Sequence, residues 1–169
     1  IVVSENIDDS RLVLEMCRKY PGVLFPCVGI HPDAFAEDRK APSDADIADI
    51  IDMIRGNQQD LLGIGEVGLD YRVVKKEKRR LEQKAFLSKI VDMSNELSLP
   101  LNVHCRSAGH YTLDLLERCN ARKVLMHAFD GKASAALPAA EAGYFFSIPP
   151  SIVRSEQKRK DSTSQLCGW

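Results

Sequence analysis

The chain has 169 residues, of which 44% are hydrophobic and 28% are charged, and its formal net charge at pH 7 is −1. This length is sufficient for one domain with a buried core. The balanced charge excludes a chain-wide surface for polyanions, so any nucleic-acid contact would depend on local basic segments. The uncharged stretch at residues 142–153 is too short to span a bilayer, so no membrane partner is expected.

The cysteines are odd in number and show no C-x-x-C spacing. They are Cys17, Cys27, Cys105, Cys119 and Cys167. This pattern favours free thiols in a reducing compartment over a disulfide framework or a cysteine zinc site. No signal peptide is visible, so we expect an intracellular location, cytoplasmic or nuclear. The chain opens without an initiating Met, and we expect it to be part of a longer protein.

The apolar pattern of the first 71 residues predicts three strands separated by two helices. Asp8 or Asp9 is the expected N-cap of the first helix, and Ser43 that of the second. The residues that end these helices are Pro21-Gly22 and Gly56. The predicted strands are residues 1–4, 23–30 and 62–71.

The same alternation continues to residue 148. It predicts a helix at 75–99, a strand at 101–106, a helix at 111–119, a strand at 123–129, a helix at 132–142 and a strand at 144–148. Apolar strands separated by helices indicate an α/β protein with a parallel sheet and crossover helices. The last residues differ, since 154–160 are highly charged and 161–169 are polar without periodicity, so we expect a frayed helical turn followed by disorder.

The third predicted strand carries a single carboxylate among glycines and apolar residues. Strict alternation places Glu66 on one face with Leu62 and Ile64, and it places Gly63 and Gly65 on the other, where close approach is possible. A charge on an apolar face is costly unless it is paired or binds metal. The alternative is a carboxylate at a strand end that reaches water.

Chemistry-bearing residues stand at the C-terminal ends of the predicted strands. They are Ser4, His31, Glu66, His104 with Arg106, His127 with Asp130, and Ser147. In a (β/α) barrel this rim is where active sites are built. Any one of these histidines is readily explained as structural, but histidines and a carboxylate at one rim form a ligand set for a divalent metal.

Because side chains alternate between the two faces of a strand, consecutive residues at this rim point in opposite directions. His104 and Arg106 share a face, so Cys105 points toward the helices and is not expected to be a ligand or a nucleophile. His127 aligns with Leu125 and points inward. His110 lies at a helix start, where a solvated position is expected.

Four motifs occur in the order found in one enzyme family. They are Gly29–Pro32, Gly65–Tyr71, Val103–Arg106 and Met126–Gly131. Together they resemble the TatD family, whose members are metal-dependent deoxyribonucleases with amidohydrolase-like (β/α)8 TIM-type barrels. Residues 143–150 resemble the TatD-domain-containing protein 3 branch. The match covers about residues 1–160, which we expect to form a partial barrel domain lacking the first and last strands, followed by an irregular tail at 161–169.

The resemblance implies a metal centre. In the family pattern, Glu66 is the catalytic, bridging carboxylate, and His104 and His127 are both ligands of the second metal ion. The His-x-His of the family's first strand and the Asp of its eighth strand have no counterpart in these 169 residues. The resemblance therefore implies two divalent ions (Zn, Mg or Mn) in the complete protein, and we expect at most one in this chain.

The resemblance also implies substrate contacts around this centre. Arg106 is the expected contact to a substrate phosphate, since its guanidinium suits a bidentate oxyanion. His31 either orients the phosphate or is structural. Asp70 is expected to orient a metal ligand. Ser107 stands where many relatives have Asp.

These residues predict a metal-dependent hydrolase that attacks phosphodiester bonds with a metal-activated hydroxide, with DNA as the expected substrate. One alternative is an amidohydrolase-like ester or amide hydrolase, and another is a catalytically inert truncated isoform. The basic residues at 75–80 either steer DNA or form a solvated helix start. The sequence indicates no oligomeric state.

Overall fold

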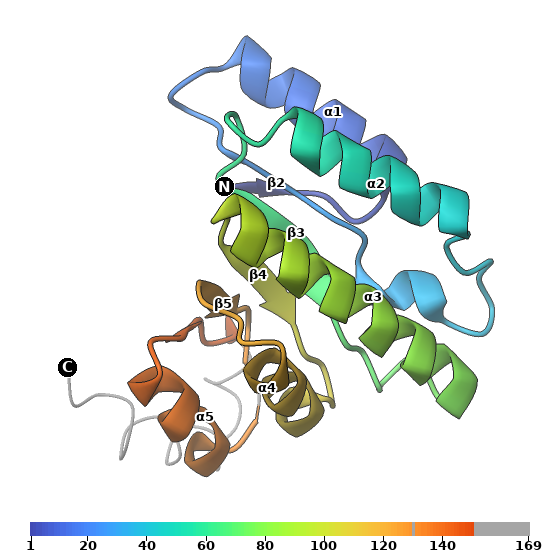
Figure 1. Ribbon diagram of the computed structural model, residues 1–169, viewed down its shortest axis with the longest axis vertical. Coiled ribbons are helices and arrows are strands. Elements are labelled where there is room, and N and C mark those ends of the chain that lie inside the picture. Colours follow the sequence, from blue (N-terminus) through green and yellow to red (C-terminus); the bar gives the residue numbers. More distant parts are fainter. Residues whose placement is uncertain (130, 151–169) are drawn as a thin grey trace.

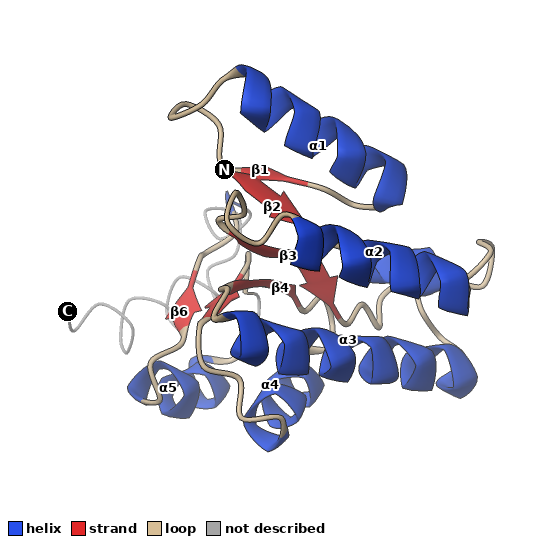
Figure 2. Ribbon diagram, turned by 45° about the horizontal axis from the view of Figure 1, so that its top comes forward, coloured by secondary structure: helices blue, strands red, loops and turns tan. Residues whose placement is uncertain are grey.

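A computed structural model describes residues 1–129 and 131–150. Its strands form one parallel sheet in which the spatial order follows the order in the chain (Figures 1 and 2). They are β1 Val2–Val3, β2 Pro26–Val28, β3 Gly63–Gly68, β4 Leu101–His104, β5 Val124–Met126 and β6 Phe145–Phe146. The predicted α/β class and parallel sheet are therefore confirmed.

A helix connects each strand to the next, and the helices lie together on one side of the curved sheet (Figure 2). They are α1 Ile7–Lys19, α2 Asp44–Gly56, α3 Glu77–Leu97, α4 Gly109–Arg118 and α5 Ala133–Glu141. A short 3-10 helix, η1 Pro32–Phe35, was not predicted. No helix in the described ranges has the length and apolar character needed to cross a membrane. The predicted tail at 154–169 lies outside the described residues.

Local capping explains where the first two helices begin. The predicted Asp8 or Asp9 cap of α1 is wrong, because the Asn6 side chain accepts the Asp9 backbone N–H at 2.9 Å and is the N-cap. Asp9 instead accepts a backbone N–H from the residue before Asn6, from within the first turn. The predicted Ser43 cap of α2 is confirmed, and Ser43 forms a capping box with Asp46.

The register of β3 shifts at its centre. Ile64 pairs with Leu101 and Val67 with Val103, so three steps along β3 match two along β4. This β-bulge interrupts the alternation of faces. Ile64 therefore shares a face with Leu101, whereas the Glu66 carboxylate contacts the opposite face of β4. The predicted common face for Ile64 and Glu66 is wrong for this reason.

The expected close approach at the strand glycines is confirmed. A Cβ added to Gly63 would lie 2.8 Å from the carbonyl oxygen of Pro100, and one added to Gly65 would lie 2.6 Å from that of Asn102. The approaching group is therefore the backbone of β4 and the residue before it. Side chains at these two positions would push β4 away from β3.

Gln83 of α3 joins the two segments that carry the rim residues of β2 and β3. Its side chain is fully buried, donates to the Pro32 carbonyl at 2.7 Å, and accepts the Asp70 backbone N–H at 3.4 Å. A buried carbonyl that loses its donor retains the cost of desolvation. Gln83 therefore stabilises both η1 and the end of β3.

We expect Gln83→Met to lower the free energy of unfolding by ~1–3 kcal/mol, because the side chain keeps its size but leaves the Pro32 carbonyl unpaired. Urea denaturation monitored by circular dichroism measures the change. Gln59→Met is the matched control, since Gln59 is exposed in a turn. Equal stability of the two variants would contradict this assignment.

Candidate active site

Three side chains from adjacent strands converge at the C-terminal rim of the sheet. His31 follows β2 and is the N-cap of η1, Glu66 lies in β3, and His104 ends β4. His104 Nδ1 lies 2.9 Å from Glu66 Oε1 and 3.3 Å from His31 Nε2, and the latter lies 3.9 Å from Glu66 Oε1. These side chains are 15–18% exposed.

The three converging atoms fit a divalent metal ion. Two ligands of a tetrahedral zinc ion lie about 3.4 Å apart when each bond is about 2.1 Å. The three separations, 2.9, 3.3 and 3.9 Å, lie around that value. Two imidazole nitrogens and one carboxylate oxygen are also a donor set that zinc accepts, with a fourth position left for water or substrate.

A carboxylate contacts the outer nitrogen of each histidine. Asp70 Oδ2 lies 3.0 Å from His104 Nε2, and Asp70 is itself buried and accepts two backbone N–H groups through Oδ1. Asp33 Oδ1 lies 2.9 Å from His31 Nδ1, and Arg39 pairs with its other oxygen at 3.0 Å. Such carboxylates fix the orientation and tautomer of metal-binding histidines.

Asp33 is a site residue that the sequence reasoning missed. The signal was local, since Asp33 stands two residues after His31 in a His-Pro-Asp turn. The His31 Nδ1 atom also lies 3.2 Å from the Asp33 backbone nitrogen. The contact to the Asp33 carboxylate is the shorter of the two, and it requires a proton on Nδ1. With the proton on Nδ1, the unprotonated Nε2 faces Glu66 and His104.

His104 and Glu66 shift each other's pKa. Burial lowers the pKa of His104, but hydrogen bonds and charges from Asp70 and Glu66 outweigh it and raise that pKa from 6.5 to about 9. Burial raises the pKa of Glu66, but the hydrogen bond from His104 and the charges of His104, His31 and His127 lower it overall. Glu66 therefore stays ionised at neutral pH, and a metal ion would replace the His104 proton at Nδ1.

The Cys27 thiol lies close to this cluster without belonging to it. Burial, together with the charge of Glu66, raises the pKa of Cys27 to about 12. A neutral thiol is a poor metal ligand. Cys17, Cys27 and Cys119 are free thiols, as the sequence predicted for them.

His127 and Arg106 lie at the rim but outside the three-residue group. His127 follows β5, which β4 separates from β3, and its exposed side chain reaches Glu66 only through its charge. Arg106 is exposed two residues after β4, and within the described residues its side chain has no hydrogen bond or ion pair. Their predicted roles as ligand and phosphate contact stay predictions. His110 is exposed at the start of α4, as expected.

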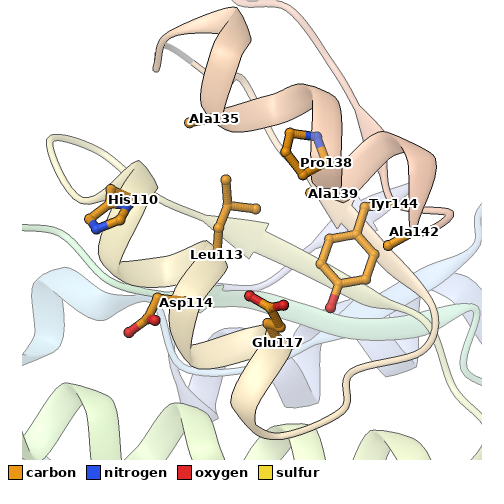
Figure 3. A pocket seen from close by; sticks show the side chains of 9 residues that line it. All are labelled: His110, Leu113, Asp114, Glu117, Ala135, Pro138, Ala139, Ala142 and Tyr144. Carbon is orange, nitrogen blue, oxygen red and sulfur yellow. The ribbon is translucent and has the colours of Figure 1, made fainter.

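A separate cleft of about 310 Å³ lies between α4 and α5 (Figure 3). Its lining includes Leu113, Glu117, Pro138 and Tyr144. None of Glu66, His104, His127 or Arg106 lines it, so this cleft is distinct from the rim cluster.

Known proteins resemble the chain along nearly its whole length. The family described as TatD related DNase matches residues 1–166. A human protein named deoxyribonuclease TATDN3 is 40% identical over 164 residues, which are 95% of this chain and 60% of the human protein. A Salmonella typhimurium protein named 3'-5' ssDNA/RNA exonuclease TatD is 27% identical over 150 residues, covering 88% of this chain and 54% of that protein.

A solved structure shows the same fold. The crystal structure of YJJV, a TatD homologue from Escherichia coli, superposes with a TM-score of 0.82 at 19% identity, covering 96% of this chain and 61% of the other. This likeness confirms the predicted barrel-type fold. The chain spans about 60% of the length of the human protein that it matches.

We expect the His104 imidazole of the metal-free protein to titrate near pH 9, and Asp70→Asn to lower its pKa toward 6.5 because the variant removes one of its two acidic partners. Nitrogen-15 NMR titration of the imidazole measures both values. The raised pKa stabilises the metal-free fold below about pH 6.5, and this contribution is lost as the pH rises through about 9. A His104 pKa near 6.5 in the unmodified protein would contradict the described contacts.

Proposed function

Since the chain belongs to the TatD related DNase family, we propose that the protein is a divalent-metal-dependent hydrolase of phosphodiester bonds, with DNA as its substrate. The observation that carries this proposal is the convergence of His31 Nε2, Glu66 Oε1 and His104 Nδ1 at the rim of the sheet. The printed names of the human and Salmonella relatives, a deoxyribonuclease and an exonuclease of ssDNA and RNA, support it.

His31, Glu66 and His104 would hold the ion. When bound, a divalent ion polarises a phosphoryl oxygen and lowers the pKa of water from about 15.7 toward 7. Glu66 supplies a negative charge that persists at neutral pH, because its pKa is lowered. Asp70 and Asp33 accept the outer N–H groups of the two histidines and keep their inner nitrogens aimed at the ion.

Arg106 and His127 complete the proposed site from the exposed side of the rim. Arg106 has no acidic partner within the described part of the chain, and its planar guanidinium suits a bidentate phosphate contact. The family resemblance implies that His127 shares an ion with His104 and the bridging Glu66, and we propose this role for it in the complete protein. Two ions among Zn, Mg and Mn are proposed for the complete protein, and at most one for these 169 residues.

An intracellular location, cytoplasmic or nuclear, is part of the proposal. The free thiols of Cys17, Cys27 and Cys119 support a reducing compartment.

We expect Glu66→Gln to reduce DNA cleavage by at least about 100-fold, because the change preserves size but removes the charge that faces both histidines. Cleavage of an end-labelled oligonucleotide, before and after chelation and metal re-addition, measures the effect. Glu15→Gln is the control, since Glu15 is exposed on α1 and should leave cleavage unchanged. Undiminished cleavage after both chelation and Glu66→Gln would count decisively against this mechanism.

His31→Ala tests whether His31 is a metal ligand or a phosphate contact. If His31 is a ligand, zinc affinity measured by calorimetry falls by at least about 100-fold. If His31 is instead a phosphate contact, zinc affinity is unchanged and KM for DNA rises. We expect the first result, because His31 Nε2 lies 3.3 Å from His104 Nδ1.

A further inference from the structure

We propose that a pair of tyrosines beside the metal-ligand cluster binds a base of a single-stranded nucleic acid. The pair and its two neighbouring cations, here called the tyrosine platform, are Tyr71, Arg80, Lys84 and Tyr111. The inference rests on the proposed function for the choice of nucleic acid as partner, and deepens it by naming where a substrate strand lies.

The chain places the platform at the same rim as the metal-ligand cluster. Tyr71 directly follows Asp70, which contacts His104, and the Tyr71 backbone N–H donates to the Arg106 carbonyl at 3.0 Å. Tyr111 lies in the first turn of α4, the helix that follows β4. Figure 1 shows that α3 and α4 both begin at the end of the sheet where β3 and β4 finish.

The ring of Tyr71 packs against the ring of Tyr111. The two rings lie 5.2 Å apart between centroids, at an interplanar angle of 50°. Tyr71 is 6% exposed, with the Arg80 guanidinium 4.3 Å from its ring centroid. Arg80 is anchored in turn, since its Nε donates to the Val74 carbonyl at 3.0 Å. The buried half of the platform is therefore held by ring packing, a cation–π contact and a hydrogen bond.

Tyr111 is the exposed half of the tyrosine platform. It is 52% exposed, and Lys84 Nζ lies 5.7 Å from its ring centroid. A single exposed tyrosine needs no explanation, but here an exposed ring packs on a buried ring and each ring has one cation beside it. Aromatic rings next to positive charge are the surfaces on which unpaired bases stack. An aromatic ring that is already ordered loses little conformational freedom when a base stacks on it.

The charge around the platform is complementary to a phosphate backbone. Residues 71–84 contain seven Lys and Arg residues and two Glu residues, whereas the whole chain has a net charge of −1. Within the described ranges, neither Arg80 nor Lys84 forms an ion pair, although Arg79 pairs with Glu82 at 2.8 Å. The positive charge is thus concentrated at the rim, where an extended strand would pass.

Single strands are favoured over duplexes by the aromatic part of the platform. The bases of a duplex are stacked on one another, so their faces are unavailable to a surface tyrosine, whereas every base of a single strand offers one. The basic residues at 75–80, which the sequence left as either a DNA-steering cluster or a solvated helix start, then lie beside the bound backbone.

The test measures binding of two fluorescein-labelled oligonucleotides of about 12 nucleotides, oligo-dT and an abasic strand of equal length. Both carry phosphorothioate linkages, so the metal-loaded protein binds them without cleavage. We expect Tyr111→Ala to raise the Kd for oligo-dT by roughly 5- to 150-fold, the range that loss of one stacked base produces, and to leave the abasic Kd unchanged. Tyr111→Phe should retain the affinity within about twofold, because it keeps the ring.

Tyr20→Ala is the matched control. Tyr20 is 48% exposed and has Lys19 Nζ 5.9 Å from its ring centroid, but it lies at the far end of α1 from the rim. We expect this variant to bind both oligonucleotides as the unmodified protein does. Lys84→Gln should weaken the binding of both oligonucleotides alike. It should also make the slope of log affinity against log salt concentration shallower by about 0.7, as loss of one phosphate contact requires.

Unchanged oligo-dT binding in Tyr111→Ala, or an equal loss for the abasic strand, would overturn the proposal. Cleavage of ordinary phosphodiester oligonucleotides is assayed separately, so the two conclusions fail independently. If the protein cleaves DNA but Tyr111→Ala binds oligo-dT normally, the platform is wrong and the proposed function stands. If Tyr111 governs binding but no phosphodiester is cleaved, the proposed function is wrong and the binding surface stands.

Discussion

The site depends on one partly buried imidazole held between two carboxylates. His104 contacts Glu66 through Nδ1 at 2.9 Å and Asp70 through Nε2 at 3.0 Å, so the end of β4 is tied to two points of β3 and the loop after it. Asp70 is buried and Glu66 is partly buried, and His104 is a partner for both charges. The same contacts orient the ring so that a metal ion can take the place of one proton.

Backbone geometry makes this contact possible. The bulge in β3 turns Glu66 toward the face of His104, and glycines let the two strands approach closely. Gly68 shows the constraint most directly, because its φ is +146° and an added Cβ would lie 2.0 Å from the His104 carbonyl oxygen. The glycines of the Gly65–Tyr71 motif are therefore part of the site's architecture, although none carries a functional group.

The rim combines two kinds of surface. Acidic and imidazole side chains gather on β2, β3 and β4 and the segments that follow them, whereas the cations and the tyrosine pair gather at the starts of α3 and α4. A chain with almost no net charge would in this way hold the proposed metal ion and face the proposed nucleic acid at neighbouring positions. The two kinds of surface stay separate because Asp70 and Tyr71, adjacent in the chain, contact different residues. Asp70 contacts His104, whereas Tyr71 packs against Tyr111.

The sequence alone determined the order of strands and helices, the parallel sheet, the Ser43 cap and the placement of Glu66 and His104 at one rim. These features depend on periodicity and on hydrogen bonds between residues close in the chain. The tertiary structure alone decided that His31 joins Glu66 and His104 while His127 lies apart, that Asp33 backs His31, and that Ile64 and Glu66 face opposite ways. The reason is that these relations depend on register and distance between strands, and one extra residue in β3 reverses a face that local alternation assigns.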